Sequence, residues 1–597
     1  MTNPGRAGLK GAALSASPGV RGSAAGSGEL RSPGEASTAG SATTEEHSEL
    51  RESDSAGAFW LFESASTTRY LLLSPISIAT LLTGDTGSLG TPALQRRMAT
   101  ASEDSESTYE QFLDHVRRLH YVEDAGGVLN WDQQVMMPDA GTPARAKQTS
   151  AISTLHHDLL TDDDLADWLA ELDDADLDPE QEAVVREVRR DHERATRVPA
   201  DLVERLSEAS SNALPVWKEA KAEDDFDAFA DTLEELVDLR REYAAAIDPD
   251  RDPYEVLFEE YEPYLGIDTA EEVLTNLRDA LVPLIDDIAD SDATLADPFE
   301  GTYDDDAQHD LVETALDTLG YDWDRGRLDT APHPFSMGTQ FDARVTTRFT
   351  PEEPLDALGS TIHEFGHATY TLGLPQDHYG TPLGDNRDLS VHESQSRFWE
   401  NHVGRSRPFW DFFTETANDH LGTDATARQF YEAFNEVYDD NLIRVEADEL
   451  TYHMHIIVRF EIERDLIRGD LDVADVPGVW NDKMEEYLGI RPDTDAEGCL
   501  QDIHWTNGAF GYFPTYTLGS VLAAQLDHHA RQDIDGFDDH VRAGEFGPIH
   551  DWLTENVHQH GARYRTDDLV EEATGESFTA EHFLDYADEK YRALYDC

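Results

Sequence analysis

The chain has 597 residues, with 45 Lys and Arg side chains against 124 Asp and Glu, for a formal net charge of −79. This charge excludes nucleic acid as a partner, because phosphate binding requires clustered basic side chains, and it disfavours anionic membrane surfaces for the same reason. A hydrophobic fraction of 39% with ten Trp is sufficient for a large buried core, so the composition predicts a folded protein.

The negative charge is unevenly distributed along the chain. Residues 1–97 carry eight basic and nine acidic side chains, whereas residues 98–597 carry 37 and 115. Such a charge destabilises a compact protein by self-repulsion, which molar salt screens because the Debye length falls to about 3 Å. We therefore interpret residues 98–597 as a halophilic protein; an acidic protein without a salt requirement is the alternative.

The cysteine content and the apolar stretches of the chain indicate the cellular compartment in which the protein works. The two cysteines, Cys499 and Cys597, form neither a disulfide framework nor a Cys-rich zinc site, which suits a reducing compartment. The longest apolar stretch, residues 70–82, is shorter than the roughly 20 residues that span a bilayer. We predict a cytoplasmic protein without a membrane partner.

The first part of the chain differs from the rest in composition. Residues 1–56 are rich in Gly, Ser, Ala and Thr, which is typical of disorder, and residues 57–97 follow no helical or strand period. We predict that residues 1–97 are a disordered or non-native extension, added by a start codon assigned too far upstream. A regulatory tail is the alternative. The remaining 98–597 are expected to form a single domain.

Helical patterns dominate this domain. Apolar side chains repeat at the three-and-four spacing of a buried helical stripe in residues 109–119 and again in 229–237. Thr269 and Glu272 have the spacing of a capping box, and Pro283 is expected to kink the helix that follows.

One segment has the period of a strand instead. In residues 341–349 the apolar side chains alternate with polar ones: Phe341, Ala343, Val345 and Phe349 against Asp342, Arg344, Thr346 and Arg348. The predicted fold class is therefore mainly α, with a small β element just before the most informative segment.

That segment, residues 361–368, contains the pattern H-E-x-x-H in His363, Glu364 and His367. On a helix, positions i and i+4 project from one face, so both imidazoles can bind one metal ion. Glu364 lies beside the first candidate ligand and is placed to act as general base toward a water molecule there. Leu358, Ile362 and Phe365 cover the opposite side and are expected to pack into the core.

A catalytic zinc needs a third protein ligand. Glu393 follows His367 by 26 residues, which leaves room for a turn and a second helix running back past the first. Two alternatives remain open at this point. Ser390 and Glu393 match a capping box, so Glu393 could serve only to cap a helix, and His392 is a competing ligand.

The motifs together resemble the carboxypeptidase Taq family of zinc metallocarboxypeptidases, from about residue 107 to the C-terminus. The resemblance rests on segments in a fixed order: residues 129–132, 137–138 and 145–146, H-P-F at 333–335, D-x-R-x-T at 342–346, the two metal segments 363–367 and 392–397, I-R-x-x-A-D at 443–448, G-x-x-Q-D-x-H-W at 498–505, and 511–519. Residues 1–97 have no counterpart in the family.

The resemblance implies a large, all-helical, groove-shaped fold that releases single amino acids from peptide C-termini. It implies His363, His367 and Glu393 as metal ligands, zinc or in some members cobalt as the metal, and a homodimer. On this basis we expect residues 98–330 to form a helical wall, 331–520 the catalytic core and 521–597 C-terminal helices.

The remaining motifs contain candidates for substrate binding. A terminal carboxylate is well bound by Arg, and Arg444 is preferred over Arg344, which Asp342 can hold in an ion pair. Arg444 has its own alternative role, an ion pair with Asp448 four residues later on an expected helix.

Carbonyl cleavage also needs a hydrogen-bond donor for the developing oxyanion. His504 and Tyr512 are the preferred candidates. They lie with Tyr516 in a stretch rich in Gly and aromatic residues, which suits a wall that contacts the substrate.

The predicted mechanism is that zinc polarises the scissile carbonyl of a peptide while Glu364 takes a proton from the attacking water and delivers it to the leaving amine. A related helical zinc endopeptidase or dipeptidyl carboxypeptidase is the alternative within enzymes. A non-catalytic metal-binding protein is the alternative outside them, and the presence of Glu364 argues against it.

Overall fold

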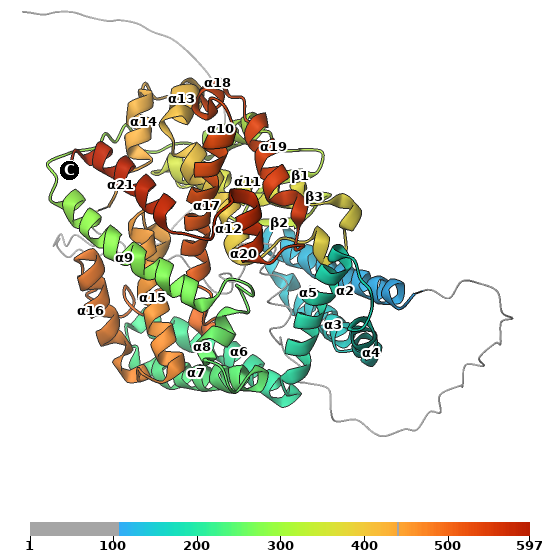
Figure 1. The fold of residues 1–597 in the computed structure, drawn as a ribbon. Coiled ribbons are helices and arrows are strands. Elements are labelled where there is room, and N and C mark those ends of the chain that lie inside the picture. Colours follow the sequence, from blue (N-terminus) through green and yellow to red (C-terminus); the bar gives the residue numbers. More distant parts are fainter. Residues whose placement is uncertain (1–106, 439–440) are drawn as a thin grey trace, which may run out of the picture. The chain divides into compact units, whose positions relative to one another are not determined.

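The computed structural model describes residues 107–438 and 441–597 (Figure 1). The predicted extension 1–97 and its boundary with the domain lie outside these residues. The described chain is mainly α-helical with one small sheet, which confirms the predicted fold class.

The helices that precede the sheet are α2 (Thr108–Trp131), α3 (Thr142–Leu160), α4 (Asp163–Leu172), α5 (Pro179–Arg197), α6 (Ala200–Glu223), α7 (Asp227–Ile247), α8 (Pro253–Phe258), α9 (Ile267–Ala289) and α10 (Asp305–Leu319). Those that follow it are α11 (Pro354–Gly373), α12 (Leu389–Arg397), α13 (Arg407–Leu421), α14 (Ala427–Ala433), α15 (Thr451–Arg468), α16 (Val476–Leu488), α17 (Pro514–Asp533), α18 (Phe537–Ala543), α19 (Gly547–Asn556), α20 (Thr566–Thr574) and α21 (Glu581–Tyr595).

Short segments of other helix types interrupt these elements. Two are π-helical, η1 (Asp132–Met136) and η5 (Phe398–Gly404). The others are 3₁₀ turns, namely η2 (Asp139–Gly141), η3 (Gln376–His378), η4 (Pro382–Gly384), η6 (Arg444–Glu446), η7 (Val473–Asp475), η8 (His504–Asn507) and η9 (His558–His560).

The two predicted amphipathic helices are present. α2 begins after Ser107, whose side chain accepts from the backbone of Glu110 while Glu110 bonds back to Ser107. This exchange satisfies two otherwise unpaired donors of the first turn. α7 covers the second predicted stripe, with Phe229, Leu233 and Leu236 buried.

The predicted capping box of α9 is wrong. The helix begins at Ile267 with Gly266 in the extended N-cap position, so Thr269 already lies inside the first turn. Pro283 lies within α9, and the helix continues past it to Ala289. The spacing of Thr269 and Glu272 therefore did not locate the start of α9, because the extended Gly266 occupies the N-cap position instead.

The sheet contains β1 (Gly326–Thr330), β2 (Ser336–Thr339) and β3 (Asp342–Thr347) in the order β1-β3-β2. β1 pairs in parallel with the central β3, Gly326 opposite Ala343, and β2 pairs antiparallel with it, Ser336 opposite Val345. The predicted strand is thus confirmed for its central part. Phe341 lies just outside it, 46% exposed, with its ring against that of Tyr379.

Most helices from α6 onward pack around two large apolar cores, whereas α2, α4 and α5 share a smaller one. The first joins α6, α7, α9, α15, α16 and α21, and the second joins α10, α11, α13, α19 and β3. α17 contributes to both, with Leu518 and Val521 in the first core and Leu522 and Leu526 in the second. α17 is thus a helix shared by the two cores.

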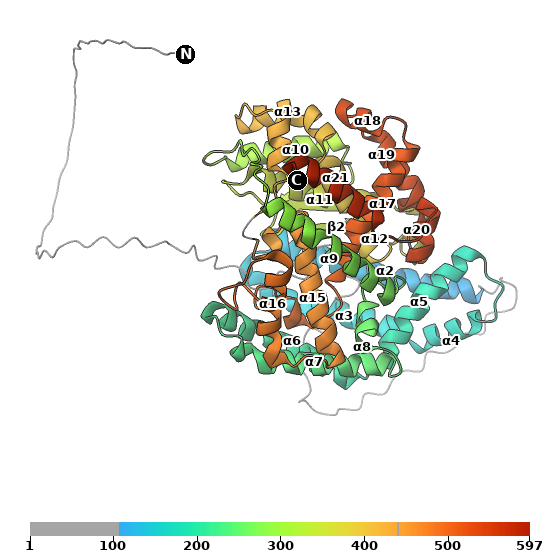
Figure 2. The ribbon, with the colours of Figure 1, turned by 60° about the vertical axis from the view of Figure 1, so that its left-hand side comes forward.

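Figures 1 and 2 place α6 and α7 at the bottom of both views and α13 and α18 at the top, with α11, α12 and α17 between them. α11 packs on β3 on one side and on α12 on another, and α12 packs on α17. No helix among the described residues is long and apolar enough to cross a membrane.

Candidate metal centre

α11 presents the H-E-x-x-H segment from one face and buries the other. Leu358, Ile362 and Phe365 are fully buried, as predicted, and each such side chain contributes about 1.5–3 kcal/mol to stability. The opposite face carries His363 and His367 with ring centroids 4.8 Å apart. This packing fixes the orientation in which both imidazoles leave the helix.

α12 brings Glu393 to the two imidazoles. Its Oε2 lies 3.7 Å from Nε2 of His363 and 3.4 Å from Nε2 of His367. One donor atom from each of the three residues lies within 4.8 Å of the others. Two imidazole nitrogens and one carboxylate oxygen are a ligand set of catalytic zinc sites, so the residues present fit a divalent metal.

Two glycines allow the three helices to approach this closely. A Cβ atom at Gly366 of α11 would lie 2.4 Å from the carbonyl oxygen of Gln395 on α12. A Cβ at Gly519 of α17 would lie 2.5 Å from both Cβ and Cγ of Glu393. Both glycines lie within the family motifs, 363–367 and 511–519, but their close contacts were not predicted from the sequence.

The geometry around α12 bears on the two alternatives for the third ligand, namely Glu393 as a helix cap and His392 as the ligand. The capping-box alternative is wrong, because Ser390 instead donates from its backbone N and its Oγ to Glu262, at 2.6 and 2.7 Å. The ring of His392 stacks on that of His367 and is not one of the three clustered donors. The carbonyl oxygen of His392 lies 3.1 Å from Nδ1 of His367 and accepts a hydrogen bond from it.

A buried network of charges orients the other side of the cluster. Nδ1 of His363 lies 2.9 Å from Oε2 of Glu400, which lies in the π-helical segment η5. Burial opposes ionisation of Glu400, but Arg397 and Arg405 outweigh it and hold the pKa of that carboxyl below its ordinary value. Because an ionised carboxylate only accepts, Nδ1 of His363 donates, which leaves Nε2 as the nitrogen that can bind a metal.

Arg397 also holds the candidate carboxylate ligand. Its Nε donates to Oε1 of Glu393 at 2.7 Å, and its Nη1 donates to Glu400 at 3.2 Å. Burial raises the pKa of Glu393, but Arg397 and the two imidazoles outweigh this effect and lower it overall. Arg397, Glu400 and Arg405 were not predicted from the sequence. The signal for Arg397 was its i+4 spacing from Glu393.

The structure brings His504, Tyr512 and Tyr516 together. The ring of His504, in η8, stacks on that of Tyr512 with the ring centroids 5.6 Å apart and the planes inclined by 28°, and the hydroxyl of Tyr516 donates to that of Tyr512 at 3.4 Å. Burial and the charges of Arg444 and Arg459 lower the pKa of His504 to about 3, against the opposing effect of Asp502. His504 is therefore a neutral imidazole at neutral pH.

Arg444 joins this aromatic cluster and does not form the ion pair that was its alternative role. It lies in the 3₁₀ turn η6, not on a helix, and it does not pair with Asp448, whose carboxylate accepts from the backbone at the start of α15. Its Nε and Nη2 both donate to Oδ1 of Asp502 at 3.1 Å, and its Nη1 donates to the hydroxyl of Tyr452 at 3.0 Å. Its guanidinium lies 5.5 Å from the ring centroid of Tyr516.

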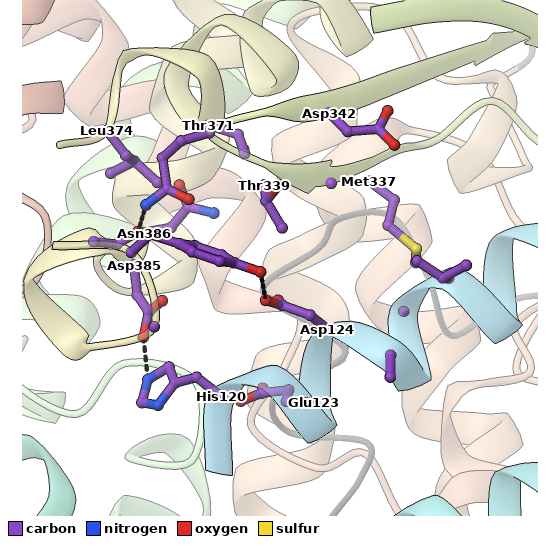
Figure 3. Close-up of a pocket in the computed structure, with 18 of the residues that line it drawn as sticks. His120, Glu123, Asp124, Met337, Thr339, Asp342, Thr371, Leu374, Asp385 and Asn386 are labelled. Carbon is purple, nitrogen blue, oxygen red and sulfur yellow. Dashed lines mark hydrogen bonds and ion pairs between the residues drawn. The ribbon is translucent and has the colours of Figure 1, made fainter. Parts of the chain in front are cut away.

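Arg344 lies elsewhere, beside a cavity of about 320 Å³ between α2, the sheet and residues 379–388 (Figure 3). It is bound to Asp342 at 2.6 and 2.9 Å, the ion pair foreseen as its alternative role. The cavity also contains the pair His120–Asp385 at 2.7 Å. Neither Arg444 nor the three candidate ligands line it.

The family model of the carboxypeptidase Taq (M32) metallopeptidases matches residues 111–591. The chain belongs to this family. Thermostable carboxypeptidase 1 of Thermus thermophilus is 38% identical over an alignment of 510 residues that covers 82% of this chain and 99% of that protein. Carboxypeptidase 1 of Bacillus subtilis is 36% identical over an alignment of 497 residues that covers 82% of this chain and 99% of that protein.

A solved M32 structure agrees with the fold. The M32 carboxypeptidase from Deinococcus radiodurans R1 superposes with a TM-score of 0.79 at 37% identity, over 82% of this chain and 100% of that one. Membership in the M32 family confirms the predicted enzyme class, a metallocarboxypeptidase that hydrolyses peptides. It argues against both the non-catalytic alternative and the endopeptidase.

Proposed function

We propose that this M32 enzyme releases single amino acids from peptide C-termini with zinc as its metal, held by His363, His367 and Glu393. The observation that carries the proposal is the convergence of these three donor atoms within 4.8 Å beside the buried Glu364. Cobalt offers the same coordination preferences for imidazole and is the second candidate metal.

The chain's own residues supply the proton transfers. When bound, zinc supplies the Lewis acidity that polarises the scissile carbonyl. Glu364, only 4% exposed and next to His363 on α11, takes the proton of the attacking water on its carboxylate and passes it to the nitrogen of the leaving amino acid. The neutral His504 and the Tyr512 hydroxyl donate to the oxygen on which negative charge develops.

Arg444 is proposed as the anchor of the substrate's terminal carboxylate. Asp502 holds its guanidinium in place next to the rings of Tyr516 and Phe513, so the charge is positioned before the substrate arrives. Binding replaces the contact from Nη1 to Tyr452, which frees donors for the carboxylate. Arg344, already paired with Asp342 beside the cavity, is the second candidate.

The working environment is proposed from composition. The net charge of −79 supports a halophilic, cytoplasmic enzyme, and the family resemblance supports a homodimer. Sedimentation equilibrium in molar salt measures the oligomeric state directly. A monomer under these conditions contradicts the dimer.

Mass spectrometry of peptide digests at high salt tests the proposed reaction. A peptide with a free C-terminus should lose one residue at a time, and the same peptide with an amidated C-terminus should stay intact. A chelator should stop the reaction, and zinc should restore it. Internal fragments, or release of dipeptides, would contradict the proposal.

A further inference from the structure

A second group of metal-ligating side chains lies apart from the centre on α11. It contains His529 of α17, His582 of α21 and Glu576 from the segment between α20 and α21, and one donor atom of each lies within 4.8 Å of the others. Nε2 of His529 lies 2.9 Å from Oε1 of Glu576, and Nε2 of His582 contacts the same oxygen. The ring of His528 stacks on that of His582 at 4.1 Å.

The backbone around Glu576 is fixed to α17 independently of these three side chains. Nε2 of Gln525 donates to the carbonyl oxygen of Ser577 at 3.0 Å, and its Oε1 accepts from the backbone N of Thr579 at 3.1 Å. Gln525 is one turn before His529 on the same helix. The fold therefore holds the three donor side chains close together before an ion binds. This reduces the conformational entropy that is lost when the ion binds.

Exposure and ligand type indicate which ion this group binds. The side chains of His529, Glu576 and His582 are 20%, 40% and 15% exposed, so an ion can reach them and keep water in its remaining positions. Imidazole ligands favour zinc, copper and nickel over magnesium and calcium, which prefer oxygen.

We propose that His529, His582 and Glu576 form a second site for a divalent transition-metal ion, which fastens α21 and residues 575–580 to α17. The site is structural. Along α17, His529 lies about 15 Å beyond Gly519, because each helical residue adds about 1.5 Å. Gly519 is the residue of α17 that contacts Glu393. None of the site's three side chains belongs to the proposed catalytic machinery, so its loss leaves turnover intact.

Equilibrium dialysis of the full-length protein against zinc at high salt, with excess magnesium to occupy carboxylate-only sites, tests this inference. The wild-type chain should bind one more tight equivalent than either His529→Gln or His582→Gln, and both variants should keep wild-type turnover. Zinc should raise the melting temperature less in these variants. Equal zinc content in the wild type and both variants would overturn the second site.

Two further variants make the comparison specific. His367→Gln should lose a different equivalent together with turnover, which separates failure of the catalytic assignment from failure of this one. His540→Gln removes a His that pairs with Glu545 at 3.1 Å but is not part of a three-donor group, and it should bind as much zinc as the wild type. A loss of zinc in His540→Gln would contradict a site built from three donors.

Discussion

Replacing Gly519 by Ala adds one methyl group at the point where α17 touches Glu393. The new carbon would lie 2.5 Å from Cβ and Cγ of Glu393, whereas carbon atoms in contact are about 3.5–4.0 Å apart. α17 or Glu393 must therefore move by roughly 1 Å. A displacement of this size in a catalytic group costs about 10²-fold in rate, so turnover should fall by about this factor and zinc should be held more weakly.

The effect on stability has two opposing parts. Overpacking a buried contact costs about 1–3 kcal/mol, and replacing a helical Gly by Ala returns about 1 kcal/mol. The net loss should be at most about 2 kcal/mol. The variant should therefore remain folded at room temperature, with a lowered melting temperature.

Gly478→Ala is the matched control. Gly478 lies on the exposed side of α16 and a Cβ there would have no neighbour within 4 Å, so this variant should match or exceed the wild-type melting temperature and keep full turnover. The assay compares turnover on a peptide with a free C-terminus, zinc content after dialysis, and melting temperature for the three proteins. Wild-type turnover and zinc content in Gly519→Ala would refute the argument that close contact with α17 positions Glu393.

Three further predictions concern the base, the salt and the first part of the chain. Glu364→Gln should keep its metal and lose about 10²–10⁴-fold in turnover, whereas Glu393→Gln should lose the metal itself; near-normal turnover in Glu364→Gln would contradict the proposed base. Melting temperature and turnover should fall steeply as sodium chloride is lowered from molar to 0.1 M, where the Debye length grows to about 10 Å, and unchanged values in dilute buffer would contradict the halophilic interpretation. Removal of residues 1–97 should leave turnover and melting temperature unchanged, and an insoluble or inactive product would contradict their assignment as an extension.

The parts of the site that the sequence predicts are those set by local spacing. His363 and His367 share a face because they are four residues apart on one helix, and β3 follows from the alternation of apolar and polar side chains up to Thr346. The spacing from His367 made Glu393 a candidate for the third ligand but left two alternatives open. What removed the capping-box alternative was Glu262, which lies 128 residues before Ser390 and has no local signal.

The parts that the sequence does not predict depend on contacts between distant segments. The partner of Arg444 is Asp502, 58 residues later, and not the nearby Asp448 that helical spacing indicated. Glu400 reaches His363 from a π-helical segment, whose wider turn the ordinary i+3 and i+4 rules do not cover. Arg344 and Arg444 both lie in family motifs, so the sequence does not distinguish their positions. The fold places Arg344 beside the cavity and Arg444 beside Tyr516.

The position of α17 between the two apolar cores has a consequence for how the enzyme unfolds. Leu518 and Val521 belong to one core and Leu522 and Leu526 to the other, so neither core can lose its packing without removing a helix from its neighbour. Melting of these two cores is therefore expected to be one cooperative transition. Because Gly519 lies between these residues and against Glu393, the carboxylate is expected to lose its position in the same step, so the metal should be released when the two cores melt.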